Sequence, residues 1–295
     1  RECEKAMSYD KRETYKEIFQ DTMQLCQTND TLKNAVAASD QKQYLMRDEM
    51  NDTADQTKRY ENPAKIIVSK KRSLEAAGNE AYRGRKICVH NFASATNPGG
   101  GVARGASAQE ECICRCSTLY PNLNSEAMRR DFYQQHKTLI KQRKMNATYN
   151  DDCIFTPGVV VFKTDDDQYR LMSEAEWYSV DVITCAAPNL RENPSNAMNP
   201  GSGTKVSELS VAQLKELHKK RLRRILSIAK KEKEEILILG AFGCGAFHNP
   251  AWLVSEAFHE IIQEFLYDFC VIEFAVYCRS RDARNYEAFC NVFQP

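Results

Sequence analysis

The 295-residue sequence carries 41 Lys and Arg against 40 Asp and Glu, and this balance excludes a strongly charged binding protein. Recognition of nucleic acid or of another phosphate polymer would have to be local, because the whole molecule offers no strong field to a polyanion. With 42% hydrophobic residues, the chain can bury one large core or two small ones. No apolar run approaches the roughly 20 residues of a membrane helix, and no apolar leader precedes the fold, so we expect a soluble cytoplasmic protein.

The first part of the chain differs from the rest. Residues 8–45 place apolar side chains at helical spacing among many charges, which predicts helix. Residues 51–63 are polar, lack a period and contain a proline, which predicts a loop. We therefore expect residues 1–64 to form a helical N-terminal extension that packs on a core formed by residues 65–295.

From residue 65 onward, short apolar runs alternate with helical patterns. Strands are expected at 66–68, 87–92, 153–155, 159–162, 180–185, 236–239 and 271–277, and helices at 72–82, 108–119, 126–142, 208–233, 250–265 and from 282. Short apolar strands between helices indicate a sheet that is covered on both faces. The turn-like run at 164–168 favours antiparallel pairing in part of that sheet. The sequence thus predicts an α/β fold with three α/β/α layers and a mixed central sheet.

The helix expected at 208–233 contains the densest basic run of the chain. An apolar stripe on the same segment favours a core-packing helix with a solvated basic face. We therefore expect no direct sequence-specific binding of nucleic acid.

Twelve cysteines are scattered along the chain, which favours reduced thiols over a disulfide framework. Cys112, Cys114 and Cys116 could suggest a metal site. Their spacing is not that of a zinc knuckle, however, and the five histidines form no ligand cluster. Buried thiols that fill the core are the favoured interpretation, and we expect no metal.

The segment from Asn97 to Glu111 is the most informative part of the chain. Three glycines, Gly99 to Gly101, let backbone amides approach a ligand, and the acids Glu110 and Glu111 can supply a proton or a base. Ser107 and Glu110 have the spacing of a capping box, which predicts that Glu110 caps a helix and leaves Glu111 as the candidate acid. Neighbours on a helix point about 100° apart, so an opposed pair of glycosidase carboxylates is not expected.

A second glycine-rich loop, residues 240–250, follows a predicted strand and precedes a helix. Asn249 is the expected N-cap and Pro250 suits the first turn. Backbone amides of Gly243 and Gly245 beside a helix N-terminus could bind an anion, although a tight structural turn is an equal alternative. The P-loop consensus is absent, and a third glycine of the dinucleotide fingerprint is missing, which leaves a nicotinamide enzyme a weak alternative.

These segments together resemble a known family. The runs at 91–101, 109–111 and 117–121 are similar to the bacterial-type poly(ADP-ribose) glycohydrolases of the macrodomain superfamily, whose hallmark is three glycines followed by Gln-Glu-Glu. Segments 156–167, 182–189 and 240–250 extend the resemblance, which covers the chain from about residue 65 to its end. The residue roles below are implied by this resemblance.

The resemblance implies that Glu111 is the catalytic glutamate, first general acid and then base, and that Glu110 helps to hold ribose hydroxyls. It implies a diphosphate loop with Phe247 packed against the substrate, and it implies no cofactor. The residues expected to bind substrate are Asn97, Gly99, Gly100, Gly101, Gln109, Gly243, Cys244, Gly245, Ala246 and Phe247.

The implied activity is hydrolysis of ribose-ribose O-glycosidic bonds in poly(ADP-ribose), with release of ADP-ribose mainly from chain ends. ADP-ribose, its polymer and ADP-ribosylated proteins are the implied partners. Two alternatives stay open at this point. One is an ADP-ribose-binding reader without hydrolysis, and the other is a hydrolase of mono-ADP-ribosylated protein or nucleic acid, because the leaving group lies beyond the motifs.

Overall fold

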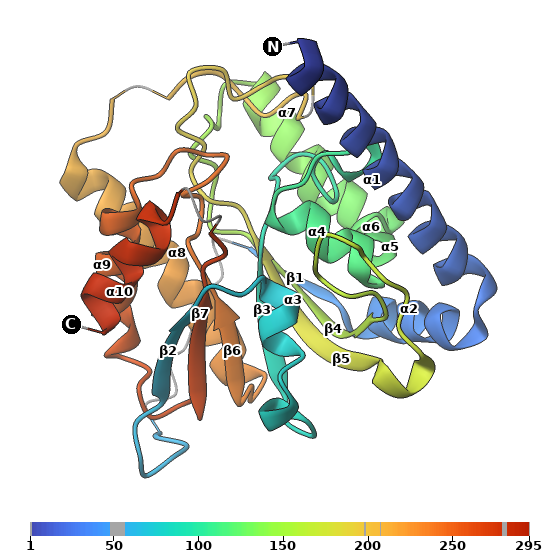
Figure 1. Ribbon diagram of the computed structural model, residues 1–295. Coiled ribbons are helices and arrows are strands. Elements are labelled where there is room, and N and C mark those ends of the chain that lie inside the picture. The colour runs from blue at the N-terminus through green and yellow to red at the C-terminus, as the bar shows by residue number, and fades with distance from the viewer. Residues whose placement is uncertain (1, 48–56, 198, 207, 279–281, 295) are drawn as a thin grey trace.

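A seven-stranded mixed sheet forms the centre of the molecule (Figure 1). The computed structural model describes residues 2–47, 57–197, 199–206, 208–278 and 282–294. The strands lie in the order β1-β4-β5-β3-β6-β7-β2. Their bounds are β1 (Tyr44–Met46), β2 (Lys65–Ser69), β3 (Ile87–Phe92), β4 (Cys153–Val161), β5 (Tyr178–Cys185), β6 (Ile236–Leu239) and β7 (Val271–Ala275).

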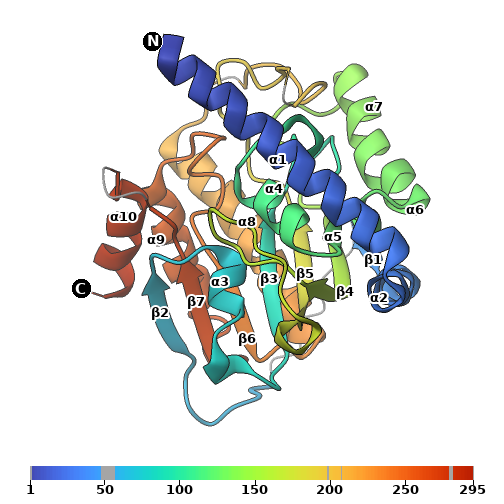
Figure 2. The same ribbon diagram turned by 45° about the vertical axis from the view of Figure 1, so that its right-hand side comes forward.

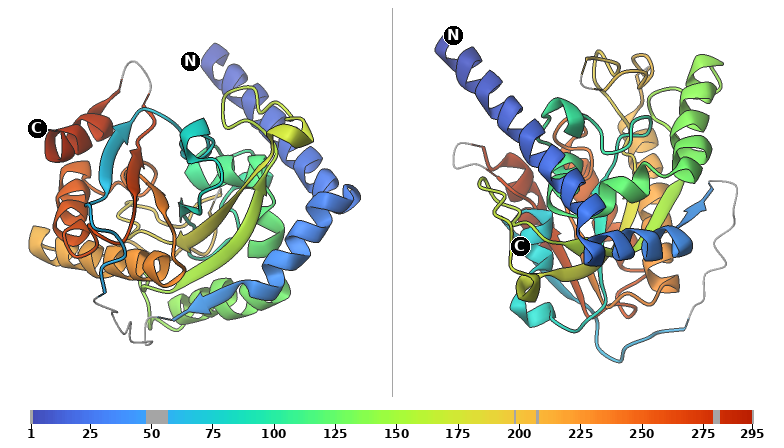
Figure 3. Two further views of the ribbon diagram at one scale, coloured as in Figure 1. Left: turned by 90° about the horizontal axis from the view of Figure 1, so that it is seen from below. Right: turned by 90° about the vertical axis from the view of Figure 1, so that its right-hand side faces the viewer.

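Helices cover both faces of this sheet, as the view from below shows (Figure 3, left). They are α1 (Glu2–Thr28), α2 (Asp30–Lys42), α3 (Ser73–Ala77), α4 (Gln109–Cys116), α5 (Leu119–Leu123), α6 (Glu126–Met128), α7 (Gln135–Lys141), α8 (Val211–Lys231), α9 (Ala251–Ile262) and α10 (Arg284–Phe293). Side chains alternate along the strands, so that Cys88 and Leu237 join the core under α8, α9 and α10, whereas Val89 and Ile238 join the core under α3, α4 and α5. The predicted three-layer α/β/α architecture is confirmed.

The sheet is parallel through β5, β3, β6, β7 and β2, and antiparallel at β4 and β1. All four residues of β6 are buried, as expected for a parallel strand between two helical layers. The carboxyl ends of five parallel strands therefore meet at one edge of the sheet, where ligands bind in folds of this kind. The antiparallel part predicted from the turn at 164–168 is present, because the chain returns through it from β4 to β5.

The predicted N-terminal helix is wrong at its C-terminal end. Asn29 interrupts it and caps α2 by accepting the N–H of Leu32. Helix then ends at Lys42, and Tyr44–Met46 form the edge strand β1, paired with Cys153–Phe155. Pairing with an existing strand outweighs the weak helical pattern of these residues. Whether a domain boundary lies at residue 64 stays a prediction, and the loop expected at 51–63 lies partly outside the described residues.

Several other predicted elements have different bounds. The two strands expected at 153–155 and 159–162 are one strand, β4, with a bulge at Pro157 and Gly158, where proline lacks an N–H and glycine adopts φ +68°. The helix expected at 72–82 is divided into α3 and a short 3-10 turn, Glu80–Tyr82. The helix expected at 108–119 ends at Cys116. Within the described ranges, no helix has the length and apolarity to cross a membrane.

A buried carboxyl group lies at the opposite end of the sheet, just before β6. The Glu234 side chain is fully buried, and its Oε1 lies 3.1 Å from Lys86 Nζ, which also lies 3.3 Å from Asp181 Oδ2. Burial and the charge of Asp181 raise the pKa of Glu234 from 4.5 to about 9. The folded protein therefore holds a proton here that the unfolded chain releases above pH 4.5.

We predict that the folded protein becomes less stable as pH rises, because Glu234 then loses this proton. A raised pKa contributes stability that is complete below the unfolded value and is lost as pH rises through the folded value. The free energy of unfolding should therefore fall between pH 4.5 and about 9, and Glu234→Gln should flatten that fall. Urea denaturation of both proteins at several pH values measures the difference. Parallel pH profiles for the two proteins would contradict the assignment.

Candidate functional site

A cavity of about 910 Å³ opens at the edge of the sheet where the parallel strands end. Residues at or just after the ends of all five strands line it: Arg72 follows β2, Phe92 ends β3, Ala187 follows β5, Ala241 follows β6 and Val276 follows β7. Both glycine-rich loops reach this cavity. The fold therefore brings together two segments that lie more than a hundred residues apart.

Gly100 lies directly against both acids. Its φ is +58°, and a Cβ at this position would lie 2.5 Å from Glu111 Oε1 and 3.0 Å from Glu110 Oε2. Only glycine allows the loop to pass this close in a left-handed conformation. The neighbouring Gly99 (φ +62°) packs on the ring of Tyr120, where a Cβ would approach the ring to 2.7 Å. The three glycines thus shape the loop around the two carboxyl groups.

Glu110 is held against the end of β3. Its side chain is 3% exposed; Oε2 accepts the N–H of Ser94 at 2.7 Å, and Oε1 lies 3.4 Å from Asn91 Nδ2. Burial, and next the charge of Glu111, raise the pKa of Glu110 well above its usual range and favour its protonated form. The predicted capping box is wrong, because α4 begins after Ala108 without a side-chain cap. Glu110 accepts the N–H of Ser94 instead of reaching back to Ser107.

The two carboxyl oxygens of Glu111 differ in their hydrogen bonding. Oε1 accepts the N–H of Gly101 at 2.9 Å, while the buried Oε2 has no hydrogen-bond partner within the part of the chain that the structure describes. An unpaired buried carboxyl oxygen is costly, and such atoms call for an explanation by function or by a bound group. Glu110 and Glu111 approach Gly100 from one helix turn, in agreement with the expectation that they are not an opposed pair.

Gln109 fixes the start of α4. Its Oε1 accepts the N–H of Phe92 at 2.8 Å, and its Nε2 donates to Ser73 Oγ at 3.0 Å and to His90 O at 2.7 Å. The amide group is thus engaged with β3 and α3, although the residue lines the cavity. These contacts position the helix that carries the acids, and a role in substrate binding stays a prediction.

The second glycine loop is held from behind by Asn249. Its Nδ2 donates to Pro188 O at 2.7 Å and to Gly243 O at 3.1 Å, and its Oδ1 lies 2.8 Å from Nε2 of the buried His218. Burial lowers the pKa of His218 to about 4, so the ring is neutral and Nε2–H donates. The prediction that Asn249 caps the next helix is wrong, because Pro250 holds the N-cap position. The Asn249 amide instead connects the loop to the segment after β5 and to α8.

Most of the predicted site residues line the cavity, but not all of them do. Nine line it: Gly100, Gly101, Gln109, Glu110, Glu111, Gly243, Gly245, Ala246 and Phe247. Asn97, Gly99 and Cys244 do not. Asn97 Nδ2 donates to Asn199 Oδ1 at 2.6 Å, and the Cys244 thiol lies 3.7 Å from Phe242 O, where burial raises its pKa. These residues shape the loops from behind, and the roles of all twelve stay predictions.

Several lining residues were missed by sequence reasoning. Asn199 accepts hydrogen bonds from Ser94 Oγ at 2.8 Å and from Asn97, which joins a distant loop to the first glycine segment. One signal could have found it, because the tripeptide Asn-Pro-Gly occurs at 97–99 and again at 199–201. Tyr15 and Tyr169 also line the cavity. Isolated tyrosines carry no comparable signal.

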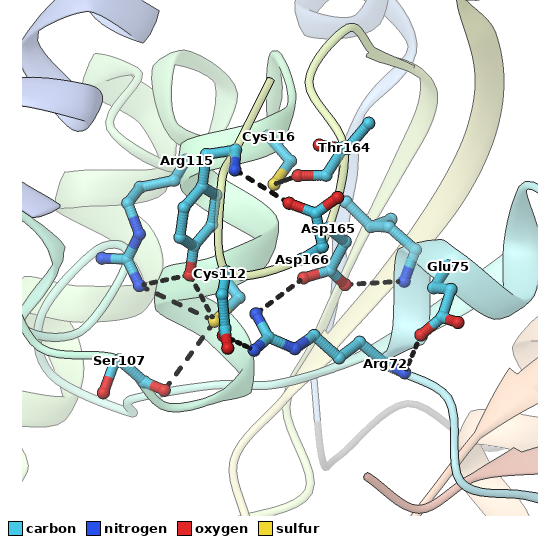
Figure 4. Close-up of polar contacts among 12 residues, drawn as sticks. Arg72, Glu75, Ser107, Cys112, Arg115, Cys116, Thr164, Asp165 and Asp166 are labelled. Carbon is cyan, nitrogen blue, oxygen red and sulfur yellow. Dashed lines mark hydrogen bonds and ion pairs between the residues drawn. The ribbon is translucent and has the colours of Figure 1, made fainter. Parts of the chain in front are cut away.

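The three cysteines of α4 pack inside the protein. Cys116 Sγ lies 3.4 Å from Thr164 O (Figure 4), and Cys112 Sγ lies 3.3 Å from the hydroxyl of Tyr169. Cys114 is fully buried. Burial raises the pKa of each thiol. These are the features of core thiols. Among the described residues, no group of His, Cys, Asp and Glu could hold a metal ion.

We predict that Gly243→Ala destabilises the protein, whereas Gly245→Ala does not. Gly243 has φ +75°, and a Cβ there would lie 2.5 Å from the Cβ of Ala187 and 2.6 Å from Asn249 Nδ2. The strain and overpacking should lower the free energy of unfolding by about 1–3 kcal/mol. A Cβ at Gly245 meets nothing within 4 Å, so this control should change stability by less than about 0.5 kcal/mol. Denaturant titration compares the two variants, and equal losses would contradict the model of the loop.

This chain resembles known proteins in sequence and in structure. The family model for the microbial-type PARG catalytic domain matches residues 12–164. The solved poly(ADP-ribose) glycohydrolase (PARG) from Thermomonospora curvata is 27% identical with a TM-score of 0.78, covering 95% of this chain and 100% of that chain. The PARG from Deinococcus radiodurans, solved in complex with ADP-ribose, is 28% identical with a TM-score of 0.71, covering 88% of this chain and 96% of that chain. None of the curated proteins matches. The chain belongs to the family of microbial-type PARG catalytic domains.

Proposed function

We propose that this protein hydrolyses the ribose-ribose bonds of poly(ADP-ribose) and releases ADP-ribose, mainly from chain ends. The observation that carries the proposal is the unengaged oxygen of Glu111, a buried carboxyl group that lines the cavity in a member of this family. Solved relatives hold ADP-ribose or the inhibitor ADP-HPD. We infer that the two loops of this chain bind the same class of ligand, because both line one cavity.

The second glycine loop would bind the diphosphate of the terminal unit. Within the described residues, the backbone N–H groups of Gly245, Ala246 and Phe247 donate to no other backbone group. Consecutive unpaired amides at such a loop make a concave site for an anion. Phe247 lines the cavity beside them, and Asn249 holds the loop in place. A diphosphate anchored here would place the distal ribose of the same unit towards the acids.

Glu111 would then act on the bond between this ribose and the next unit. Its Oε2 donates a proton to the leaving ribose oxygen, the C–O bond breaks, and the released sugar passes through an oxocarbenium-like state. The ionised carboxylate, stabilised by the Gly101 N–H, next removes a proton from water while the water oxygen bonds to the anomeric carbon. Glu111 ends protonated, and the shortened polymer carries a free hydroxyl group.

Glu110 would hold the ribose during this step. Because its pKa is raised, the protonated form can donate a hydrogen bond to a ribose oxygen, while its other oxygen accepts the Ser94 N–H. The Gly100 backbone fixes both carboxyl groups in place before substrate arrives. Such preorganisation converts binding of the remote diphosphate into orientation at the reacting bond.

We predict that Glu111→Gln strongly slows hydrolysis while it leaves ligand binding nearly intact. Glutamine keeps the shape of the side chain and can accept the Gly101 N–H, but it cannot donate the proton. Loss of a general acid should lower the rate by about 10²- to 10⁴-fold. Calorimetry with ADP-ribose should give an unchanged affinity, and release of ADP-ribose from polymer measures the activity.

The exposed Glu126→Gln is a matched control and should behave as the wild type. A Glu111→Gln enzyme that hydrolyses polymer at nearly the wild-type rate would remove Glu111 from the mechanism. A wild-type protein that binds ADP-ribose but never releases it from polymer would instead identify a reader.

A further inference from the structure

The N-terminal helix α1 contributes a wall of the cavity. Lys11, Arg12 and Tyr15 line it, together with residues 105–108 of the first glycine loop. Helix α1 crosses α4 (Figure 2), and α4 lies between α1 and β6, the strand that leads into the second glycine loop (Figure 1). The cavity is therefore lined by the acids, by the second glycine loop and by a helix that carries two cations, Lys11 and Arg12.

Backbone contact fixes α1 against the first glycine loop. Gly105 adopts φ +75°, and a Cβ there would lie only 2.3 Å from the carbonyl oxygen of Arg12. Gly105 lies four positions after Gly101, whose N–H donates to Glu111. Packing of the Gly105 main chain on the Arg12 main chain therefore fixes the position of Lys11 and Arg12 relative to the first glycine loop.

Side-chain contacts attach α1 to the helix that carries the acids. The guanidinium of Arg115 on α4 lies 4.6 Å over the ring of Tyr15 and 5.2 Å over that of Tyr169. The hydroxyl of Thr22 donates to Arg115 O at 2.6 Å. Cation–π contacts and a buried hydrogen bond of this kind hold α1 and α4 as one unit.

The acidic and the basic side chains that line this end of the cavity have different surroundings. The guanidinium of Arg72 lies 3.9 Å from Asp165 (Figure 4) and also contacts Asp167, so both of these lining carboxylates have a cation beside them. Lys11 and Arg12 are exposed on α1. This wall therefore offers positive charge to a ligand that enters beside Glu111.

We propose that Lys11 and Arg12 bind the diphosphate of the polymer unit on the leaving side of the scissile bond. This subsite rests on the proposed function, because a terminal unit anchored at residues 245–247 directs the remainder of the polymer to the other side of Glu111. Each unit of that polymer carries two phosphates, and Lys and Arg are the side chains that neutralise them. The subsite distinguishes a polymer, which continues beyond the scissile bond as a polyanion, from a single ADP-ribose.

The test is charge reversal in the double variant Lys11→Glu/Arg12→Glu. Because both side chains are exposed, the fold should tolerate the change. The KM for polymer should rise about tenfold, with kcat unchanged, and the rise should shrink at high salt. The Kd for ADP-ribose should stay within about twofold of wild type, since the terminal subsite is untouched. Lys11→Ala/Arg12→Ala should give a smaller rise in the same direction.

The double variant Lys33→Glu/Lys42→Glu is the matched control, with the same change in net charge at exposed positions of α2 outside the cavity. It should leave the KM for polymer unchanged. An unchanged KM in the Lys11/Arg12 variant, or an equal loss of affinity for ADP-ribose, would overturn the subsite. A loss confined to DNA that carries one ADP-ribose would also overturn it and would identify a nucleic acid as the leaving group.

Binding measured in a Glu111→Gln background separates this proposal from the proposed function. There, polymer affinity should fall on charge reversal at positions 11 and 12 while ADP-ribose affinity does not, whether or not the wild type hydrolyses polymer. If the wild type does not hydrolyse polymer, this result contradicts the proposed function and leaves the subsite proposal standing. Equal polymer affinity with and without the reversal would count against the subsite alone.

Discussion

The contact between Gly100 and the two acids is the constraint on which the site depends. A backbone with φ +58° passes so close to Glu110 and Glu111 that no Cβ could be accommodated, and the N–H of Gly101 is thereby placed on Glu111. Two acidic side chains are buried as a result, which costs free energy unless hydrogen bonds and a retained proton offset it. The rest of the site serves to hold this arrangement in place.

The parallel sheet supplies the frame for that contact. Strand β3 ends at the first loop and β6 ends at the second, and the two strands are hydrogen-bonded neighbours. Amide side chains then connect loops to strands, with Gln109 joining α4 to β3 and Asn249 joining the second loop to its surroundings. Both loops thus have short links to a rigid core, and a ligand spanning them would meet a site that is already formed.

Local pattern predicted the layers and both glycine loops, because short apolar strands and glycine runs are signals within a few residues. It failed where the partner of a side chain is distant in sequence. Glu110 has capping-box spacing but accepts the N–H of Ser94, 16 residues earlier. Asn249 resembles an N-cap, but its amide donates to the carbonyl of Pro188, 61 residues earlier. The strand at Tyr44–Met46 exists because β4 is there to pair with it. Such choices between competing hydrogen bonds depend on three-dimensional proximity, which spacing along the chain does not contain.

The packing of Gly105 on the Arg12 carbonyl separates two kinds of sequence change. Because the contact is between main-chain atoms, replacement of the exposed side chains of α1 leaves the helix seated, whereas a side chain at position 105 would displace it. Related sequences can therefore vary the charges presented by this helix without disturbing the carboxyl groups. Family members could therefore differ in the leaving group that they prefer, while the chemistry of bond cleavage stays the same.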